Sequence, residues 1–302
     1  MKLAIGFFDG VHLGHQRILA GADAALTFRE HPLSVLAPDK APPLLMTPEE
    51  RFAAIAAALN GKPETFPPSH LPTFPSLVRA LDFTHELAAE PAETFAARLG
   101  RDYPDLEAIL CGPNWRFGAG GAGDADFLRA HGFTVEVVPL EELDGAPVSS
   151  TRIRAALQAG DLPAANAMLG RSFAVAGTVV PGKGEGRKLG FPTINMRPAN
   201  PCLARLLPLG VYVADTVWGR AVANWGQAPT MGEQAWASPV LEVHIIRPLD
   251  SLDVLEPLDS RESPEPLTIS LLRFLRPERR FASVEVLREQ IKVDVFSASH
   301  SP

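Results

Sequence analysis

Residues 5–16 read IGFFDGVHLGHQ, and this stretch decides how the first half of the chain folds. It continues a mostly apolar run that begins at Lys2, and it contains the turn signal Asp9-Gly10. Residues 16–20, QRILA, then continue as a helix. The pattern predicts a strand, a tight turn and a helix.

Two histidines, His12 and His15, fall where that helix begins, and their spacing of three residues places them on one face. Free backbone N–H groups and the positive end of the helix dipole favour a bound phosphate there. Gly10 and Gly14 leave the backbone open to close approach by a ligand. We interpret the stretch as a nucleotide-phosphate site, although a lone histidine near a helix start is usually a surface or packing residue.

This stretch resembles the HxGH nucleotidyltransferases, which attack the α-phosphate of a nucleoside triphosphate and expel pyrophosphate. The longer match, GFFDGVHLGHQ, is similar more narrowly to the FMN adenylyltransferase half of bacterial FAD synthetases. The resemblance implies an α/β domain with a Rossmann-like parallel sheet, in which His12 and His15 are catalytic. The residues that it implies in nucleotide binding here are Gly6, Phe7, Phe8, Asp9, Gly10 and Gly14.

The composition sets limits on the class of protein. A chain of 302 residues with 46% hydrophobic and 21% charged residues suggests two ordinary globular domains. The formal net charge of −7 argues against a general nucleic-acid binder. Cys111 and Cys202 are too few for a disulfide framework, and no apolar run reaches the roughly 18 residues of a membrane span. We expect a cytoplasmic protein that binds small molecules, not nucleic acid or membranes, and weak self-association stays open.

A strand predicted at residues 24–28 leads into TFREHP at residues 27–32, which resembles the family's TFxPHP segment apart from Glu30. The resemblance places His31 in the adenine nucleotide site. A capping box at residues 47–50 predicts a helix to about Leu59, which we interpret as structural. A further helix should begin after residues 90–91 and end at Gly100.

A buried strand is predicted at residues 107–112, followed by the glycine-rich loop 113–124, PNWRFGAGGAGD. In open α/β sheets ligands bind at the carboxyl ends of strands, although a plain surface turn is the alternative. The loop resembles the family's GxNFRFG signature, with Trp115 in place of Phe. Asn114 and Arg116 are therefore expected to contact the nucleotide.

Residues 149–154, SSTRIR, begin a helix that should run to about Gln158, so hydroxyls and cations gather at a helix start. The arginines can neutralise charge on a pyrophosphate leaving group, whereas Ser150 alone could be an ordinary N-cap. The segment resembles the family's SSTxIR motif. The resemblance implies catalytic roles for Ser150 and Arg154 and nucleotide contacts for Thr151 and Arg152.

The chain becomes rich in predicted strands after a short helix at residues 161–170, so we expect domains at 1–170 and 171–302. Residues 181–195, PGKGEGRKLGFPTIN, follow a strand and lack the Walker spacing, but their glycines suit an anion-binding nest. Thr193 and Asn195 lie on the same side if extended, and they offer hard oxygen ligands for Mg²⁺.

This region resembles the flavokinase signature GRxLGFPTAN, with Ile194 in place of Ala. The resemblance implies a small β-barrel riboflavin kinase domain with a C-terminal helix, predicted here from Ser283 to about Lys292. It also implies that Thr193 and Asn195 hold the Mg²⁺ bound to ATP, and that Glu242 is the base for the riboflavin hydroxyl. The remaining ATP-binding residues expected in this half are Gly182, Lys183, Gly184, Gly186 and Arg187.

Alternation along residues 241–245 places Glu242 with His244 on one face of a strand, although a solvated strand face is the plain alternative. We predict a bifunctional riboflavin kinase and FMN adenylyltransferase that uses ATP and Mg²⁺, with riboflavin, FMN and FAD as substrate and products. The chain between His244 and Leu267 departs from the family's DxDGDLYG-like loop. An FMN adenylyltransferase with a degenerate kinase domain therefore stays open. There is room for only a short helix between Gln16 and Thr27, where relatives usually carry a longer one, so a non-catalytic flavin- or nucleotide-binding protein stays open as well.

Overall fold

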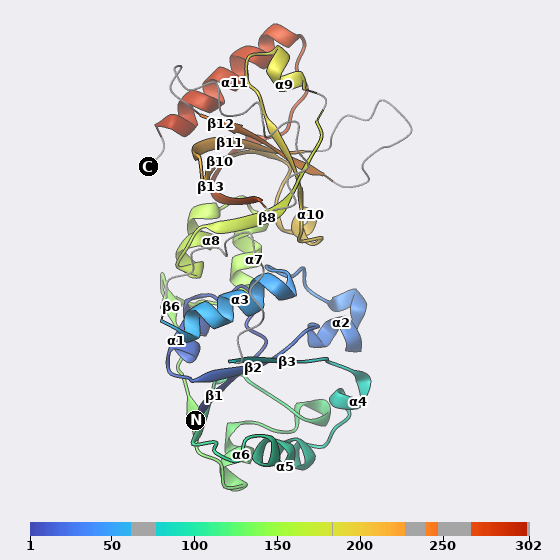
Figure 1. Ribbon diagram of the computed structural model, residues 1–302, viewed down its shortest axis with the longest axis vertical. Helices are drawn as coiled ribbons and strands as arrows, with labels where there is room; N and C mark the ends of the chain where they lie inside the picture. Colours follow the sequence, from blue (N-terminus) through green and yellow to red (C-terminus); the bar gives the residue numbers. More distant parts are fainter. Residues whose placement is uncertain (62–76, 183, 227–238, 247–266, 301–302) are drawn as a thin grey trace. The chain divides into compact units, whose positions relative to one another are not determined.

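The computed structural model describes residues 1–61, 77–182, 184–226, 239–246 and 267–300. These residues form two compact units that divide between Ser150 and Thr151 (Figure 1). The division falls before the predicted boundary at residue 170, because α8 (Leu162–Leu169) packs against strands of the second unit. That boundary stays a prediction, and each unit is described by itself.

The first unit is built on a five-stranded parallel sheet in the order β3-β2-β1-β4-β5. The strands are β1 (Lys2–Ile5), β2 (Ala24–Phe28), β3 (Val78–Leu81), β4 (Ala108–Cys111) and β5 (Val135–Val137). The chain moves outward from β1 in one direction through β2 and in the other through β4, so the switch point of the sheet lies between β1 and β4. Ligands bind outside the carboxyl ends of strands at such a point. The predicted parallel sheet is confirmed.

Helices cover both faces of this sheet, with α1 and α3 on one face and α5 and α6 on the other (Figure 1). Leu3 and Ile5 of β1 pack in one cluster with Phe95 and Leu99 of α5. The helices of the unit are α1 (Leu13–Ala20), α2 (Pro32–Leu36), α3 (Pro48–Leu59), α4 (His85–Ala88), α5 (Ala92–Asp102) and α6 (Ala125–Ala130). Two short 3-10 turns (Pro38–Lys40 and Ala119–Gly121) and the hairpin of β6 (Glu142–Leu143) and β7 (Ala146–Pro147) complete it.

The predicted start of α3 is confirmed in detail. The Thr47 hydroxyl accepts from the backbone N–H of Glu50, and the Glu50 carboxylate accepts from that of Thr47. The predicted end of α5 at Gly100 is wrong, because the helix continues to Asp102. Burial of Leu99 against the core and the hydrogen bond from the Tyr103 N–H to the Leu99 carbonyl carry the last turn past the glycine.

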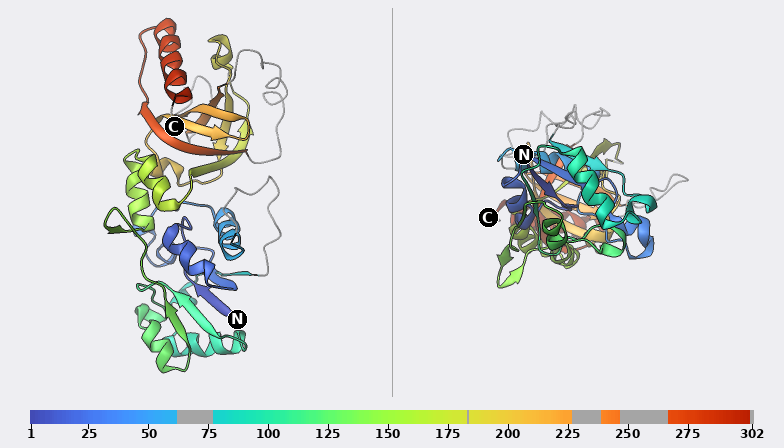
Figure 2. Two further views of the ribbon diagram at one scale, coloured as in Figure 1. Left: turned by 90° about the vertical axis from the view of Figure 1, so that its left-hand side faces the viewer. Right: turned by 90° about the horizontal axis from the view of Figure 1, so that it is seen from below.

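The second unit contains a closed barrel in the order β10-β11-β12-β9-β8-β13, which confirms the predicted barrel (Figure 2). Its strands are β8 (Phe173–Val180), β9 (Ile194–Pro198), β10 (Gly210–Thr216), β11 (Gly219–Gly226), β12 (Val240–Ile245) and β13 (Leu267–Pro277). Two single-turn helices, α9 (Glu185–Lys188) and α10 (Leu203–Leu206), join strands of the barrel, and α7 (Ser150–Gln158) and α8 precede it.

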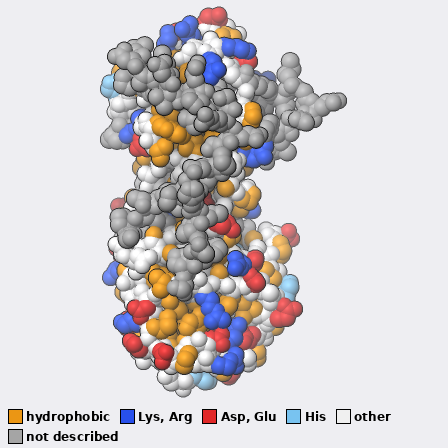
Figure 3. All heavy atoms as spheres, in the orientation of Figure 1, with side chains coloured by type: hydrophobic (Ala, Val, Ile, Leu, Met, Phe, Trp, Pro, Cys, Tyr) orange, Lys and Arg blue, Asp and Glu red, His pale blue; other side chains and the backbone are white. Residues whose placement is uncertain are grey.

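The C-terminal helix α11 (Val284–Ser299) packs against β10 and β11. It runs past the predicted end near Lys292, because its last turns still carry buried residues, Asp294 and Ala298. On the face shown in Figure 3, Lys and Arg side chains are interspersed with Asp and Glu rather than gathered in one basic area. Among the described residues, no helix has the length and apolar character needed to span a bilayer.

Candidate functional site

The turn between β1 and α1 is unusual in its backbone and in its burial. Phe8 and Val11 adopt positive φ angles of 58° and 38°, which side-chain-bearing residues rarely do and which mark strain at functional sites. Phe8, Asp9 and Val11 are almost completely buried. Both carboxylate oxygens of Asp9 accept from the Leu45 N–H, at 3.1 and 3.2 Å. The turn is therefore held in a single shape from inside the protein.

The two histidines of the turn meet as their spacing predicted. His12 is the N-cap of α1, and its ring stacks on that of His15 with the centroids 3.6 Å apart. A Cβ on Gly14 would lie 3.3 Å from the His12 ring, so the glycine permits this close packing. Burial, followed by the nearby His12 imidazole, lowers the pKa of His15 well below its usual value. His15 is thus neutral at physiological pH, with one ring nitrogen as a donor and the other as an acceptor.

Ser150, the last residue of the first unit, contacts this turn. Its hydroxyl donates to the carbonyl oxygen of Asp9 at 2.8 Å, a contact within the first unit. Thr151, Arg152 and Arg154 follow Ser150 on α7 and belong to the second unit. Asn114 and Arg116 are exposed in the loop after β4, at the carboxyl edge of the sheet, where Arg116 lies 3.8 Å from Asp124.

His31 lies beside the same turn, at the end of β2. Its Nδ1 accepts from the Leu33 N–H at 3.1 Å, and its ring contacts that of Phe7 edge-on, with the centroids 4.8 Å apart. Gly6 is tied to β2 through the Leu26 carbonyl, which accepts from its N–H at 3.2 Å. The structure therefore brings the HxGH turn, His31 and Ser150 together within the first unit.

Arg51 is a residue of this region that the sequence reasoning missed. It sits in the first turn of α3 with 0% of its surface exposed, and its guanidinium carbon lies 3.8 Å from the centroid of the Phe7 ring. The available signal was its position four residues before Ile55, on the face of α3 that packs inward. Burial lowers its pKa to about 10, so it remains charged at neutral pH.

In the second unit, three polar side chains stand side by side on neighbouring strands. Asn195 of β9 pairs with Glu242 of β12, and Glu242 pairs in turn with Asn224 of β11. All three are half-buried, while Leu241 and Val243 are buried on the opposite face of β12. The predicted alternation of β12 is therefore confirmed.

The pKa values of Glu242 and of His244, two residues further along β12, are both shifted by burial. Burial, followed by the Glu278 carboxylate, raises the pKa of Glu242. Glu278 is a second residue that the sequence reasoning missed; its Oε1 would lie 2.7 Å from a Cβ on Gly226. His244 donates from Nδ1 to the Pro192 carbonyl at 2.8 Å, which leaves its Nε2 as an acceptor. Burial lowers the pKa of His244.

The glycine-rich loop lies directly against Thr193 and Asn195. A Cβ on Gly182 would lie 1.9 Å from Nδ2 of Asn195, and one on Gly186 would lie 3.3 Å from the Thr193 hydroxyl. A Cβ at Gly182 would therefore displace the Asn195 amide, and one at Gly186 would also lie 2.4 Å from the backbone oxygen of Phe191. Gly184 adopts φ +69° before α9, which carries Arg187. Lys183 lies outside the described residues. So do residues 247–266, which form most of the stretch between His244 and Leu267 that departs from the family's loop.

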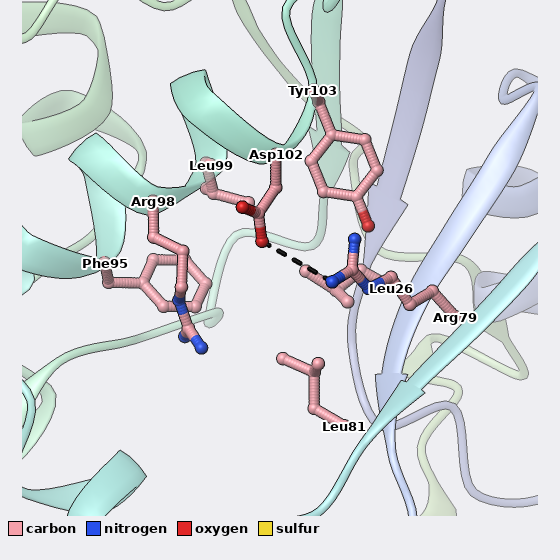
Figure 4. Close-up of a pocket in the computed structure, with 8 residues that line it drawn as sticks. All are labelled: Leu26, Arg79, Leu81, Phe95, Arg98, Leu99, Asp102 and Tyr103. Carbon is pink, nitrogen blue, oxygen red and sulfur yellow. Dashed lines mark ion pairs between the residues drawn. The ribbon is translucent and has the colours of Figure 1, made fainter.

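A separate cavity lies between α5 and the sheet (Figure 4). Arg98 and Asp102 of α5 and Arg79 of β3 line it, and Arg79 pairs with Asp102 at 3.5 Å. Because α5 lies on the face of the sheet opposite to α1 and α3 (Figure 1), this cavity is not part of the histidine turn.

Comparisons with known proteins give a matching family for each half of the chain and relatives for the whole of it. A family model described as FAD synthetase matches residues 1–59 and 76–152, and one described as riboflavin kinase matches residues 169–301. A bifunctional riboflavin kinase/FMN adenylyltransferase of Pseudomonas fluorescens is 36% identical over 307 residues, covering 97% of this chain and 90% of that protein. Proteins of the same description from Escherichia coli K12 and Bacillus subtilis 168 are 31% and 30% identical, covering 98% and 97% of this chain and 91% and 89% of theirs.

A solved structure described as a macrolide-efflux protein from Streptococcus pneumoniae has the same fold, with a TM-score of 0.76 and 26% identity. The likeness covers all of this chain and 94% of that one. With a nucleotidyltransferase-like sheet, a closed barrel and relatives matched along nearly their full length, the chain belongs to the bifunctional riboflavin kinase/FMN adenylyltransferase family.

Proposed function

We propose that this protein phosphorylates riboflavin to FMN with ATP and then adenylylates FMN with a second ATP to give FAD and pyrophosphate. The observation that carries the proposal is the presence of two separate polar sites, each in the unit whose family model names the matching activity. The histidine turn lies in the FAD synthetase half, and the Asn195-Glu242 pair lies in the riboflavin kinase half.

In the kinase step, Glu242 takes the proton of the riboflavin 5′-hydroxyl as that oxygen bonds to the γ-phosphorus of ATP and ADP leaves. A raised pKa suits this role, because a carboxylate that prefers its protonated form is a better base. The glycine-rich loop, from Gly182 through Gly184 and Gly186, presents backbone to the phosphates, and Arg187 adds a cation.

Thr193 and Asn195 are the residues proposed to hold Mg²⁺. Their hydroxyl and amide oxygens are hard ligands, and the glycine backbone packed against both side chains leaves a cradle that a Cβ would fill. The metal, when bound with ATP, neutralises charge on the transferring phosphate. Among the described residues, no group of three or more His, Cys, Asp or Glu side chains offers a different metal site.

In the adenylyl-transfer step, an oxygen of the FMN phosphate bonds to the α-phosphorus of ATP, and the bond to pyrophosphate breaks. The stacked rings of His12 and His15 at the start of α1 donate hydrogen bonds to the phosphates, aided by the helix dipole. Ser150, Thr151, Arg152 and Arg154 are proposed to neutralise the leaving pyrophosphate. Phosphate is a competent nucleophile, so positioning rather than a strong base accounts for the rate.

The remaining predicted contacts follow from the same geometry. The turn from Gly6 to Gly10 and His31 are proposed to line the ATP site, with Gly14 allowing the histidine rings to pack. Asn114 and Arg116 are proposed to close the site from the loop after β4. Their place at the carboxyl edge of the sheet, next to the switch point, supports this assignment.

The test is product analysis by chromatography with riboflavin or FMN as the flavin substrate, in the presence of ATP and Mg²⁺. We expect FMN and FAD from riboflavin, FAD and pyrophosphate from FMN, and loss of both activities when the metal is chelated. FAD from FMN without any FMN from riboflavin would identify an adenylyltransferase with a degenerate kinase domain. Flavin binding without either product would identify a non-catalytic binding protein.

A further inference from the structure

Arg51 joins two segments that are distant in sequence. Its Nη2 donates to the carbonyl oxygens of Phe28 at 2.6 Å and Arg29 at 2.9 Å, at the end of β2. The same guanidinium stacks on Phe7, with 3.8 Å between its central carbon and the ring centroid. Phe7 belongs to the turn after β1, so one side chain contacts both the turn and the chain that leads to His31.

These contacts continue toward the predicted nucleotide site. The ring of Phe7 contacts both the guanidinium and, in a T-shaped arrangement, the His31 imidazole, whose centroid lies 4.8 Å from that of Phe7. The Phe7 carbonyl accepts from the Thr27 hydroxyl of β2 at 3.2 Å. Movement of the Arg51 head would therefore be transmitted to both Phe7 and His31.

Stability alone does not explain why an arginine is buried at this position. Arg51 is fully buried, yet its Nε and Nη1 have no hydrogen-bond partner among the described residues. Each buried N–H of a cation that lacks an acceptor costs free energy, and an apolar side chain of similar length would avoid this penalty. The planar guanidinium, by contrast, can bridge two carbonyls and stack on a ring at the same time, which no apolar side chain can do.

We propose that Arg51 is a positioning residue for adenylyl transfer: it fixes the Phe7 turn against the end of β2, so that the His12 and His15 pair and His31 face one nucleotide. This inference rests on the proposed adenylyltransferase function. The role is indirect, because Arg51 acts through Phe7 and the Phe28 and Arg29 carbonyls rather than by contact with substrate.

The experiment compares Arg51→Met, Arg51→Lys and a matched control, Arg98→Met, in the full chain. Arg98 lies on the opposite face of the same sheet, beside the cavity of Figure 4, and pairs with Glu90. Steady-state rates of FAD formation from FMN and of FMN formation from riboflavin are measured for each variant. The kinase rate reports whether the second unit of each variant is folded, and the far-UV circular dichroism spectrum reports whether the first unit keeps its fold.

We expect Arg51→Met to lower kcat for FAD formation by about 100-fold, the scale of a misplacement of roughly 1 Å, with a smaller change in KM. Arg51→Lys should recover part of the loss, because an ammonium can reach a carbonyl but cannot bridge two and stack. The kinase rate should be unchanged in both variants, and Arg98→Met should leave both activities unchanged. The side-chain NMR signal of His31 should shift in Arg51→Met, while that of His300 should not.

A kcat for FAD formation within about twofold of the unchanged protein in Arg51→Met would overturn the inference. Equal losses of both activities would also overturn it, since Arg51 would then serve the fold as a whole. If the unchanged protein forms no FAD from FMN, the proposed function fails first, whatever the variants do.

Discussion

The imidazole of His15 is the group through which pH acts most directly on the histidine turn. Its Nδ1 is buried and has no hydrogen-bond partner among the described residues, and its ring contacts those of His12 and Phe8. A proton placed on this ring would be poorly solvated and close to a second imidazole. The neutral form is therefore favoured in the folded state.

The consequence for stability has a definite sign. The pKa of His15 is lower in the folded protein than in the unfolded chain, where it is about 6.5. Below that pH the unfolded state binds a proton that the folded state does not, so acidification favours unfolding. We expect the free energy of unfolding to rise between about pH 5 and 6.5 more steeply in the unchanged protein than in His15→Gln. Urea unfolding across this range measures the difference, and parallel curves would contradict the assignment.

In the second unit, an ion pair of Arg276 and Asp294 connects the end of β13 to α11. Asp294 of α11 is 5% exposed and accepts from Nε of Arg276 at 3.1 Å and from Nη2 at 2.7 Å. Gln290, one turn earlier, donates to the same carboxylate at 2.8 Å. The pair thus fastens α11 to the end of β13.

Removing Asp294 should leave the largely buried Arg276 guanidinium without its carboxylate partner. We expect Asp294→Ala to lower the free energy of unfolding by about 3 kcal/mol, as for other broken buried pairs. Glu289→Ala is the matched control on the same helix, because its pair with Lys292 is exposed and should contribute about 0.5 kcal/mol or less. Urea unfolding of the three proteins gives the comparison, and equal effects of the two substitutions would show that the buried pair is not what fastens α11.

At the scale of the whole molecule, the histidine turn and the Asn195-Glu242 pair lie in different units, and each unit has its own buried core. The two activities should therefore be separable by single substitutions. We expect His15→Ala to abolish FAD formation from FMN while FMN formation from riboflavin continues. Gly182→Ala should do the reverse, because its Cβ would lie 1.9 Å from Asn195.

The control for the glycine substitution is Gly100→Ala in α5, where the nearest atom to the added Cβ is 3.7 Å away, an ordinary contact. Both activities should survive in it. Mixing the His15→Ala and Gly182→Ala proteins should restore FAD formation from riboflavin, since FMN released by one can be used by the other. Loss of both activities in either single variant would contradict independent sites.

The sequence by itself was sufficient for the local structure and for the family. Periodicity and the Thr47 capping box act over a few residues, so they predicted β2 and α3 close to their observed bounds. The spacing of His12 and His15 was enough to place both rings on one helical face. Local signals failed where burial outweighs them: Gly100 does not end α5, and α11 continues past Lys292 because Asp294 and Ala298 are buried.

Only the tertiary structure decided which distant residues meet. Ser150 bonds to the Asp9 carbonyl across 141 positions of the chain, and Asn195, Glu242 and Asn224 align through strand register. The burial of Arg51 beneath Phe7 is decided in the same way, because a charged residue in a helix is ordinarily exposed. Short-range steric and hydrogen-bonding preferences are encoded residue by residue, whereas these contacts depend on how whole strands and helices pack, which no short stretch of sequence specifies.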